Sequence, residues 1–171
     1  GALLVRRGLR LEPLLVGGDQ ERARRAGLEN VAGLAGFAAA CAALGDGRLA
    51  DEADRARRLT ERVLTGVAEM DGVPAYGDPV DRLPHVVCLG IEGIEPQGVL
   101  LGLDRAGVAA HSGSACSSES LEPSPVLEAM GVDAHRSLRL SVGWGTTDDD
   151  IDRAIGALGV TIDRLRALAT G

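Results

Sequence analysis

One short segment carries a side chain of obvious reactivity, the thiol of Cys116 within Ser112-Gly-Ser-Ala-Cys-Ser-Ser118. Cysteine is usually among the most buried residues, but small polar neighbours cannot bury a thiol. A cysteine in such a loop is more typical of a nucleophile, because an accessible thiolate is the reactive form. His111 precedes it by five residues, and contact between the two would favour the thiolate. The alternative is an incidental free cysteine.

The other two cysteines, Cys41 and Cys88, lie in apolar segments, and both are expected to pack in the core. The chain has 3 cysteines, an odd number, and none has CxxC spacing. Neither a disulfide framework nor a zinc or other metal site is therefore expected. Free thiols make a reducing cytoplasm the expected compartment.

Hydrophobic patterns predict the elements that would position the reactive loop. Strands are predicted at residues 2–6, 11–16, 85–91, 108–110 and 137–142, and helices at 30–44, 49–70, 96–105, 125–130 and 147–168. Asn30 is expected to cap the first helix, and Thr147 the last. Alternating strands and helices indicate the α/β or the α+β class. Two domains are expected, residues 1–46 and 47–171.

Charge and hydropathy exclude several kinds of partner. The formal net charge is −7, so binding of nucleic acid through a basic face is not expected. Arg22, Arg24 and Arg25 could still hold one phosphate or carboxylate. No apolar run reaches the roughly 18 residues of a membrane span. No signal peptide is expected, because no charged region precedes the first apolar residues.

Four motifs, in order along the chain, resemble one known family. They are the segments Gly1–Leu14, Gly17–Asn30, Ser112–Gly131 (SGSACSS…LEPSPVLEAMG) and Ser137–Thr147 (SLRLSVGWGTT). Together they resemble the C-terminal region of cysteine desulfurases, the NifS-like group of fold-type I enzymes that use pyridoxal phosphate (PLP). The resemblance implies the tail of the large PLP-binding domain at 1–46 and the small domain at 47–171.

The resemblance implies a reaction and roles for two residues. The family converts L-cysteine to L-alanine and keeps the sulfur as a persulfide on a cysteine that matches Cys116, for transfer to an acceptor protein. Arg139 matches the arginine that binds the substrate carboxylate; the alternative is a surface ion pair. The resemblance also implies a homodimer. Iron–sulfur cluster assembly, tRNA thiolation and DNA modification are all open as the destination of the sulfur.

Two positions depart from the family pattern. Leu28 stands where the family has a threonine that contacts the PLP phosphate of the partner subunit, and leucine has no side-chain donor. Trp144 stands where arginine is frequent, and its role is open.

A larger difference is the absence of lysine, since all 18 of the Lys and Arg residues are arginine. PLP enzymes hold their coenzyme as a Schiff base on a lysine amine. The coenzyme lysine is therefore expected outside these residues, and the chain alone is expected to be inactive. Other hypotheses are a thiol module that relays sulfur without PLP, a degenerate fragment, and a lyase that acts on selenocysteine.

Overall fold

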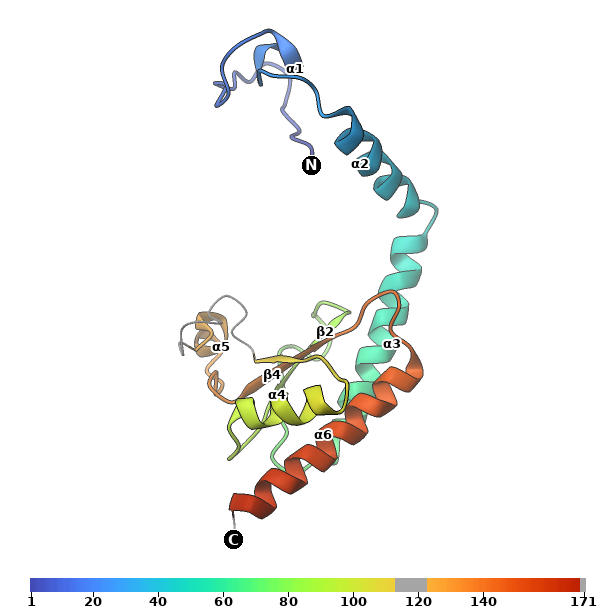
Figure 1. Cartoon of the computed structure of the whole chain (residues 1–171), viewed down its shortest axis with the longest axis vertical. Helices are drawn as coiled ribbons and strands as arrows, with labels where there is room; N and C mark the ends of the chain where they lie inside the picture. The colour runs from blue at the N-terminus through green and yellow to red at the C-terminus, as the bar shows by residue number, and fades with distance from the viewer. Residues whose placement is uncertain (113–122, 170–171) are drawn as a thin grey trace. The chain divides into compact units, whose positions relative to one another are not determined.

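The computed structural model of the 171-residue chain describes residues 1–112 and 123–169 (Figure 1). The chain divides into two compact units, Gly1–Leu49 and Ala50–Gly171. Its helices are α1 (Gln20–Ala23), α2 (Val31–Ala43), α3 (Arg48–Ala68), α4 (Pro96–Arg105), α5 (Pro125–Ala129) and α6 (Asp148–Ala169). Its strands are β1 (Ala75–Tyr76), β2 (Val86–Gly90), β3 (His111–Ser112) and β4 (Ser137–Ser141).

The first unit contains α2, which begins as predicted. The Asn30 side chain accepts a hydrogen bond from the Gly33 amide at 2.9 Å and so caps the helix. None of the residues of α2 is buried, however, and Cys41 is exposed. The expectation that Cys41 packs in a core is therefore wrong, because within residues 1–49 no apolar element covers this helix.

The strands predicted at residues 2–6 and 11–16 are also wrong. These segments form no regular element. A strand needs a neighbour to satisfy its backbone N–H and C=O groups. Among the described residues, every strand pairing lies between Ala75 and Ser141, and none reaches the first unit.

The second unit is built on an antiparallel sheet of four strands in the order β1-β2-β4-β3. Its central pair confirms the strands predicted at 85–91 and 137–142, with Cys88 opposite Arg139 and Leu89 opposite Leu138. The two-residue strand β1 was not predicted, because so short a segment shows no alternation.

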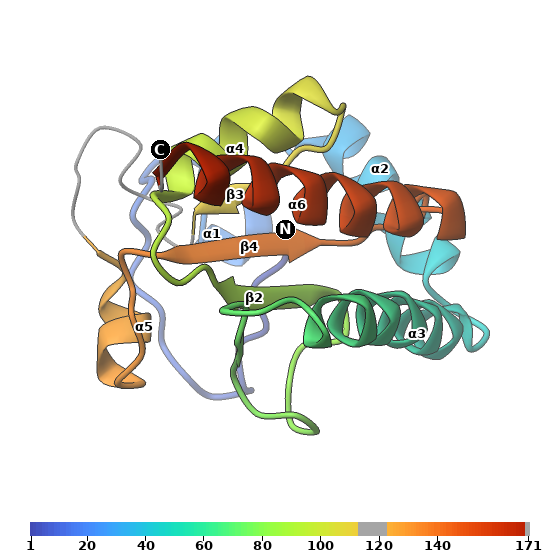
Figure 2. The ribbon, with the colours of Figure 1, turned by 90° about the horizontal axis from the view of Figure 1, so that it is seen from below.

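One face of the sheet carries the core. Leu89 and Leu138 point to this face and are fully buried. In Figure 2, α4 and α6 lie along β4, whereas α3 extends away from the end of β2. The apolar sides of all three helices complete the cluster. Its helical members are Leu59, Val63, Val67, Val99, Leu103, Ile151, Leu158 and Ile162. Helices packed against a sheet confirm the α/β class.

The strand predicted at 108–110 lies instead at His111–Ser112. Gly107 follows α4 with a φ of 76°, and the Val108 amide donates to the Leu103 carbonyl at 2.9 Å. This hydrogen bond closes the C-terminal turn of the helix. Val108 is thus engaged with α4, and pairing with β4 starts only at His111.

The start of α6 confirms the predicted cap. The Asp150 amide donates to the Thr147 hydroxyl at 3.2 Å, and the Thr147 amide donates to an Asp150 carboxylate oxygen at 2.9 Å. These reciprocal hydrogen bonds satisfy two amides that the helix leaves free. The Thr147 amide also holds the pKa of Asp150 below its ordinary value.

Candidate functional site

A row of four chemically active side chains crosses the sheet on the face opposite the core. Tyr76 pairs with Cys88, Cys88 pairs with Arg139, and Arg139 pairs with His111. Partners directly opposite in antiparallel strands point to the same face. The core contains the alternate residues of β2 and β4, so this row points away from it. Sequence periodicity places each residue on a face, but nothing in it showed that these strands align in this register.

Arg139 is the cation of this row. It is half-buried, and among residues 1–112 and 123–169 no carboxylate forms an ion pair with its guanidinium. The surface ion pair considered as an alternative is therefore not found in the described part of the chain. A half-buried guanidinium is a strong partner for a carboxylate, which it can bind through two parallel hydrogen bonds.

Cys88 lies beside Arg139 and is half-buried. The expectation that it packs in the core is wrong, because its strand neighbours Val87 and Leu89 take the core face. Burial raises the pKa of the Cys88 thiol, and the positive charge of Arg139 acts in the opposite direction. The guanidinium is thus close enough to act on the sulfur electrostatically.

His111 flanks Arg139 on the other side. Its Nδ1 atom lies in hydrogen-bond contact with the Ser112 carbonyl oxygen. A carbonyl oxygen only accepts, so Nδ1 is the donor in this contact. The contact holds the imidazole beside its own backbone in β3, next to Arg139 in the sheet.

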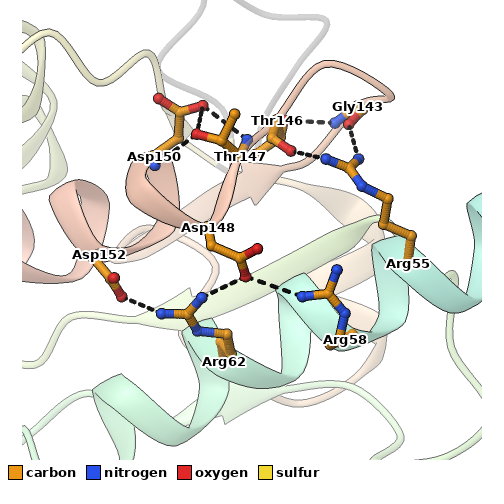
Figure 3. Close-up of polar contacts among 9 residues, drawn as sticks. All are labelled: Arg55, Arg58, Arg62, Gly143, Thr146, Thr147, Asp148, Asp150 and Asp152. Atoms are coloured by element: carbon orange, nitrogen blue, oxygen red, sulfur yellow. Dashed lines mark hydrogen bonds and ion pairs between the residues drawn. The ribbon is translucent and has the colours of Figure 1, made fainter.

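The turn after β4 is held from α3 by one arginine (Figure 3). Arg55 donates to the Trp144 carbonyl at 3.1 Å and also to the Thr146 carbonyl. The Thr146 hydroxyl accepts from the Gly143 amide at 2.9 Å, which closes the turn. Trp144 projects from it with 87% of its surface exposed. The turn thus has a fixed backbone and an uncovered aromatic side chain.

A second group of arginines on α3 pairs with the start of α6 (Figure 3). Asp148 accepts from Arg62 at 2.5 Å and from Arg58 at 3.0 Å, and Arg62 also reaches Asp152 at 2.5 Å. The hydrogen bond from Arg62 holds the pKa of Asp148 below its ordinary value. These ion pairs join two helices of the core. Because the charged groups are exposed, we expect salt to weaken the pairing.

We expect Asp148 to contribute to the acid sensitivity of the fold. Because its pKa is lower in the folded state, its contribution is complete above the unfolded pKa of about 3.9 and is lost as pH falls through the folded pKa. Asp148→Asn should lower the urea midpoint near pH 6 and have little effect near pH 2. Asp149→Asn, on the same helical turn, is the control for helix-dipole effects. An equal drop at both pH values would contradict the assignment.

The remaining residues singled out in the sequence do not belong to the strand pairings that form this row. Cys116 lies outside the described residues. Leu28 is 87% exposed, and its carbonyl accepts from the Arg25 guanidinium at 3.3 Å. Arg25 is thus the one member of the predicted anion-binding cluster whose guanidinium contacts the backbone at Leu28.

The residues present do not fit PLP as an enzyme holds it. The coenzyme needs a lysine amine, and all 18 basic residues of the chain are arginine. Leu28 adds no side-chain donor for a phosphate. In the described part of the chain, no three or more His, Cys, Asp or Glu residues gather as metal ligands. No helix there combines the length and apolarity needed to cross a bilayer.

Comparison with known proteins identifies the family. The model of the aminotransferase class-V family matches residues 1–154. Cysteine desulfurase IscS 1 of Archaeoglobus fulgidus is 42% identical over 99% of this chain, and a cysteine desulfurase of Gluconacetobacter diazotrophicus is 45% identical over the same share. The solved structure of a NifS-like protein from Rickettsia africae superposes on 91% of the chain with a TM-score of 0.74 and 29% identity.

The chain therefore belongs to the class-V aminotransferase family. The cysteine desulfurases that its motifs resemble are among the relatives that match it. It spans less than half of the curated relatives it matches, 45% of the Archaeoglobus protein and 43% of the Gluconacetobacter protein. It likewise covers 41% of the Rickettsia chain.

Proposed function

We propose that this chain is the C-terminal part of a PLP-dependent cysteine desulfurase. Relatives named cysteine desulfurase, which align with 99% of the chain, support this proposal. In the proposed enzyme, sulfur passes from L-cysteine to the Cys116 thiol, which becomes a persulfide, and L-alanine is the other product. The coenzyme and its lysine are supplied by residues outside this chain.

The observation that carries the proposal is the guanidinium of Arg139 on the face of the sheet opposite the core, where no carboxylate of residues 1–112 and 123–169 forms an ion pair with it. L-Cysteine has an α-carboxylate, and a bidentate contact with arginine fixes the orientation of the atoms attached to its α-carbon. β3, which pairs with the Arg139 strand, ends at Ser112, where the Cys116 segment begins. The strand that pairs with the Arg139 strand therefore leads, along the sequence, into the segment of Cys116, which supports the assignment of both proposed roles to one unit.

The proposal extends to partners and location. A persulfide is useful only when a second thiol or a cluster scaffold takes the sulfur, so a sulfur-accepting protein is the proposed partner. A homodimer and a cytoplasmic location complete the proposal, and both come from the family resemblance and the free thiols.

A fusion tests this function. The chain is joined behind the N-terminal part of the Archaeoglobus relative, which this chain lacks, and compared with the chain alone and with the complete relative. We expect the fusion to bind PLP with a visible absorption band and to release L-alanine from L-cysteine. The chain alone should show no such band, because it has no lysine. If the fusion binds PLP but forms no L-alanine, the proposed desulfurase activity is wrong. If the isolated chain shows a borohydride-sensitive band, the proposal that the coenzyme lysine lies outside this chain is wrong.

A further inference from the structure

We propose that Cys88 and Arg139 form a covalent modification site for small electrophiles that carry a carboxylate. The guanidinium binds the carboxylate, and the Cys88 sulfur attacks the adjacent electrophilic carbon. Neither the family comparison nor the proposed reaction gives Cys88 a role.

The geometry of the sheet brings the two groups together. Cys88 and Arg139 are direct partners in the β2–β4 register. Residues opposite each other in antiparallel strands have Cβ atoms about 4.5–5.5 Å apart and point to the same face. A carboxylate bound to the guanidinium therefore lies within the length of a two- or three-carbon acid from the sulfur.

Charge makes the site selective for anions. Within the described residues no carboxylate forms an ion pair with Arg139, so a bound anion does not have to displace one of these carboxylates. Burial raises the pKa of the Cys88 thiol, which keeps most of it protonated and slow toward neutral reagents near neutral pH. Arg139 opposes that shift and raises the local concentration of an anionic reagent. We therefore expect Cys88 to prefer anionic over neutral reagents, and we do not expect it to be unusually reactive.

The covalent step is a simple displacement with an α-halo acid. The Cys88 S–H bond breaks and its proton passes to water. A carbon–sulfur bond forms while the carbon–halogen bond breaks, and halide leaves with the bonding electrons. A modified Cys88 places its new carboxylate on Arg139. The block of L-cysteine binding that follows rests on the proposed function, whereas the modification itself does not.

The test uses the complete chain without coenzyme. Iodoacetate is the anionic probe and iodoacetamide is its neutral counterpart, and peptide mass mapping gives the alkylation rate at each cysteine. We expect the ratio of the iodoacetate rate to the iodoacetamide rate to be about tenfold higher at Cys88 than at the exposed Cys41. Sodium chloride at high concentration should reduce this difference.

Variants and a competitor separate the charge effect from unfolding. Arg139→Gln should lower the ratio at Cys88 to that of Cys41, and Arg139→Lys should keep part of it. Far-UV circular dichroism shows whether the Arg139→Gln fold is intact, and the ratio of the two rates cancels the effect of the lost charge on the thiol pKa, which acts on both reagents alike. If that variant unfolds, acetate in the unmodified chain should slow iodoacetate at Cys88 and leave iodoacetamide unaffected. The proposal is overturned if the ratio of the iodoacetate rate to the iodoacetamide rate is the same at Cys88 and Cys41. It is also overturned if the higher ratio at Cys88 persists in folded Arg139→Gln, or if acetate does not slow iodoacetate at Cys88.

Discussion

Cys116→Ser in the fusion described above is expected to lower L-alanine formation by about 10³-fold or more, the range seen when a nucleophile that acts with its neighbours is removed. A serine hydroxyl is almost entirely protonated near pH 7, whereas a cysteine thiol has a much lower pKa and supplies a useful fraction of thiolate. Binding of L-cysteine should persist, because the carboxylate anchor is unchanged. Amino-acid analysis of the product and mass spectrometry of the Cys116 peptide measure the two effects.

Cys41→Ser is the matched control for this change. Cys41 is an exposed thiol on α2, in the other unit. Its replacement should leave both L-alanine formation and the persulfide on the Cys116 peptide intact. If Cys116→Ser retained full activity, or if the extra sulfur were found on Cys41, the assignment of Cys116 would be wrong.

Arg139→Gln should raise the KM for L-cysteine about 30- to 150-fold, which corresponds to the roughly 2–3 kcal/mol of a charged hydrogen-bonded contact. Glutamine keeps a donor but loses the charge and the second parallel hydrogen bond. The carboxylate takes no part in bond breaking, so we expect a smaller effect on kcat. Steady-state kinetics of the fusion separates the two parameters.

The comparison with Arg139→Lys sharpens this result. Lysine restores the charge without the planar fork, so its KM should lie between those of the parent and Arg139→Gln. Far-UV circular dichroism checks that β4 still forms. An unchanged KM in Arg139→Gln, or a loss confined to kcat, would contradict a role for Arg139 in binding the carboxylate.

The sequence predicted the second unit well, because its elements carry strong local signals. The apolar stripe of α3 and the Thr147 cap of α6 identify their helices without reference to the rest of the chain. The predicted helix at 96–105 and the observed α4 agree, since Pro96 and Gly107 mark its ends. Residues at the helix ends themselves determine these boundaries, so a single sequence was enough to predict them.

The first unit and the candidate site were harder to predict, because both depend on contacts between distant residues. Residues 2–6 are apolar like a buried strand, but no partner strand pairs with them in the described chain. Alternation alone could not show that Cys88 and Arg139, which are far apart in sequence, are cross-strand partners. Cys41 was misplaced for a related reason, because an apolar helix is buried only when something covers it.

Because Arg55 holds the turn that carries Trp144, the fluorescence of this tryptophan can report on the surface around the turn. Trp144 is the single tryptophan, and it projects into solvent from a backbone fixed by hydrogen bonds. Its emission in the native state should already resemble that of tryptophan in water, so unfolding will scarcely shift the spectrum. A blue shift with loss of iodide quenching would instead report that another surface has come to rest against the end of β4.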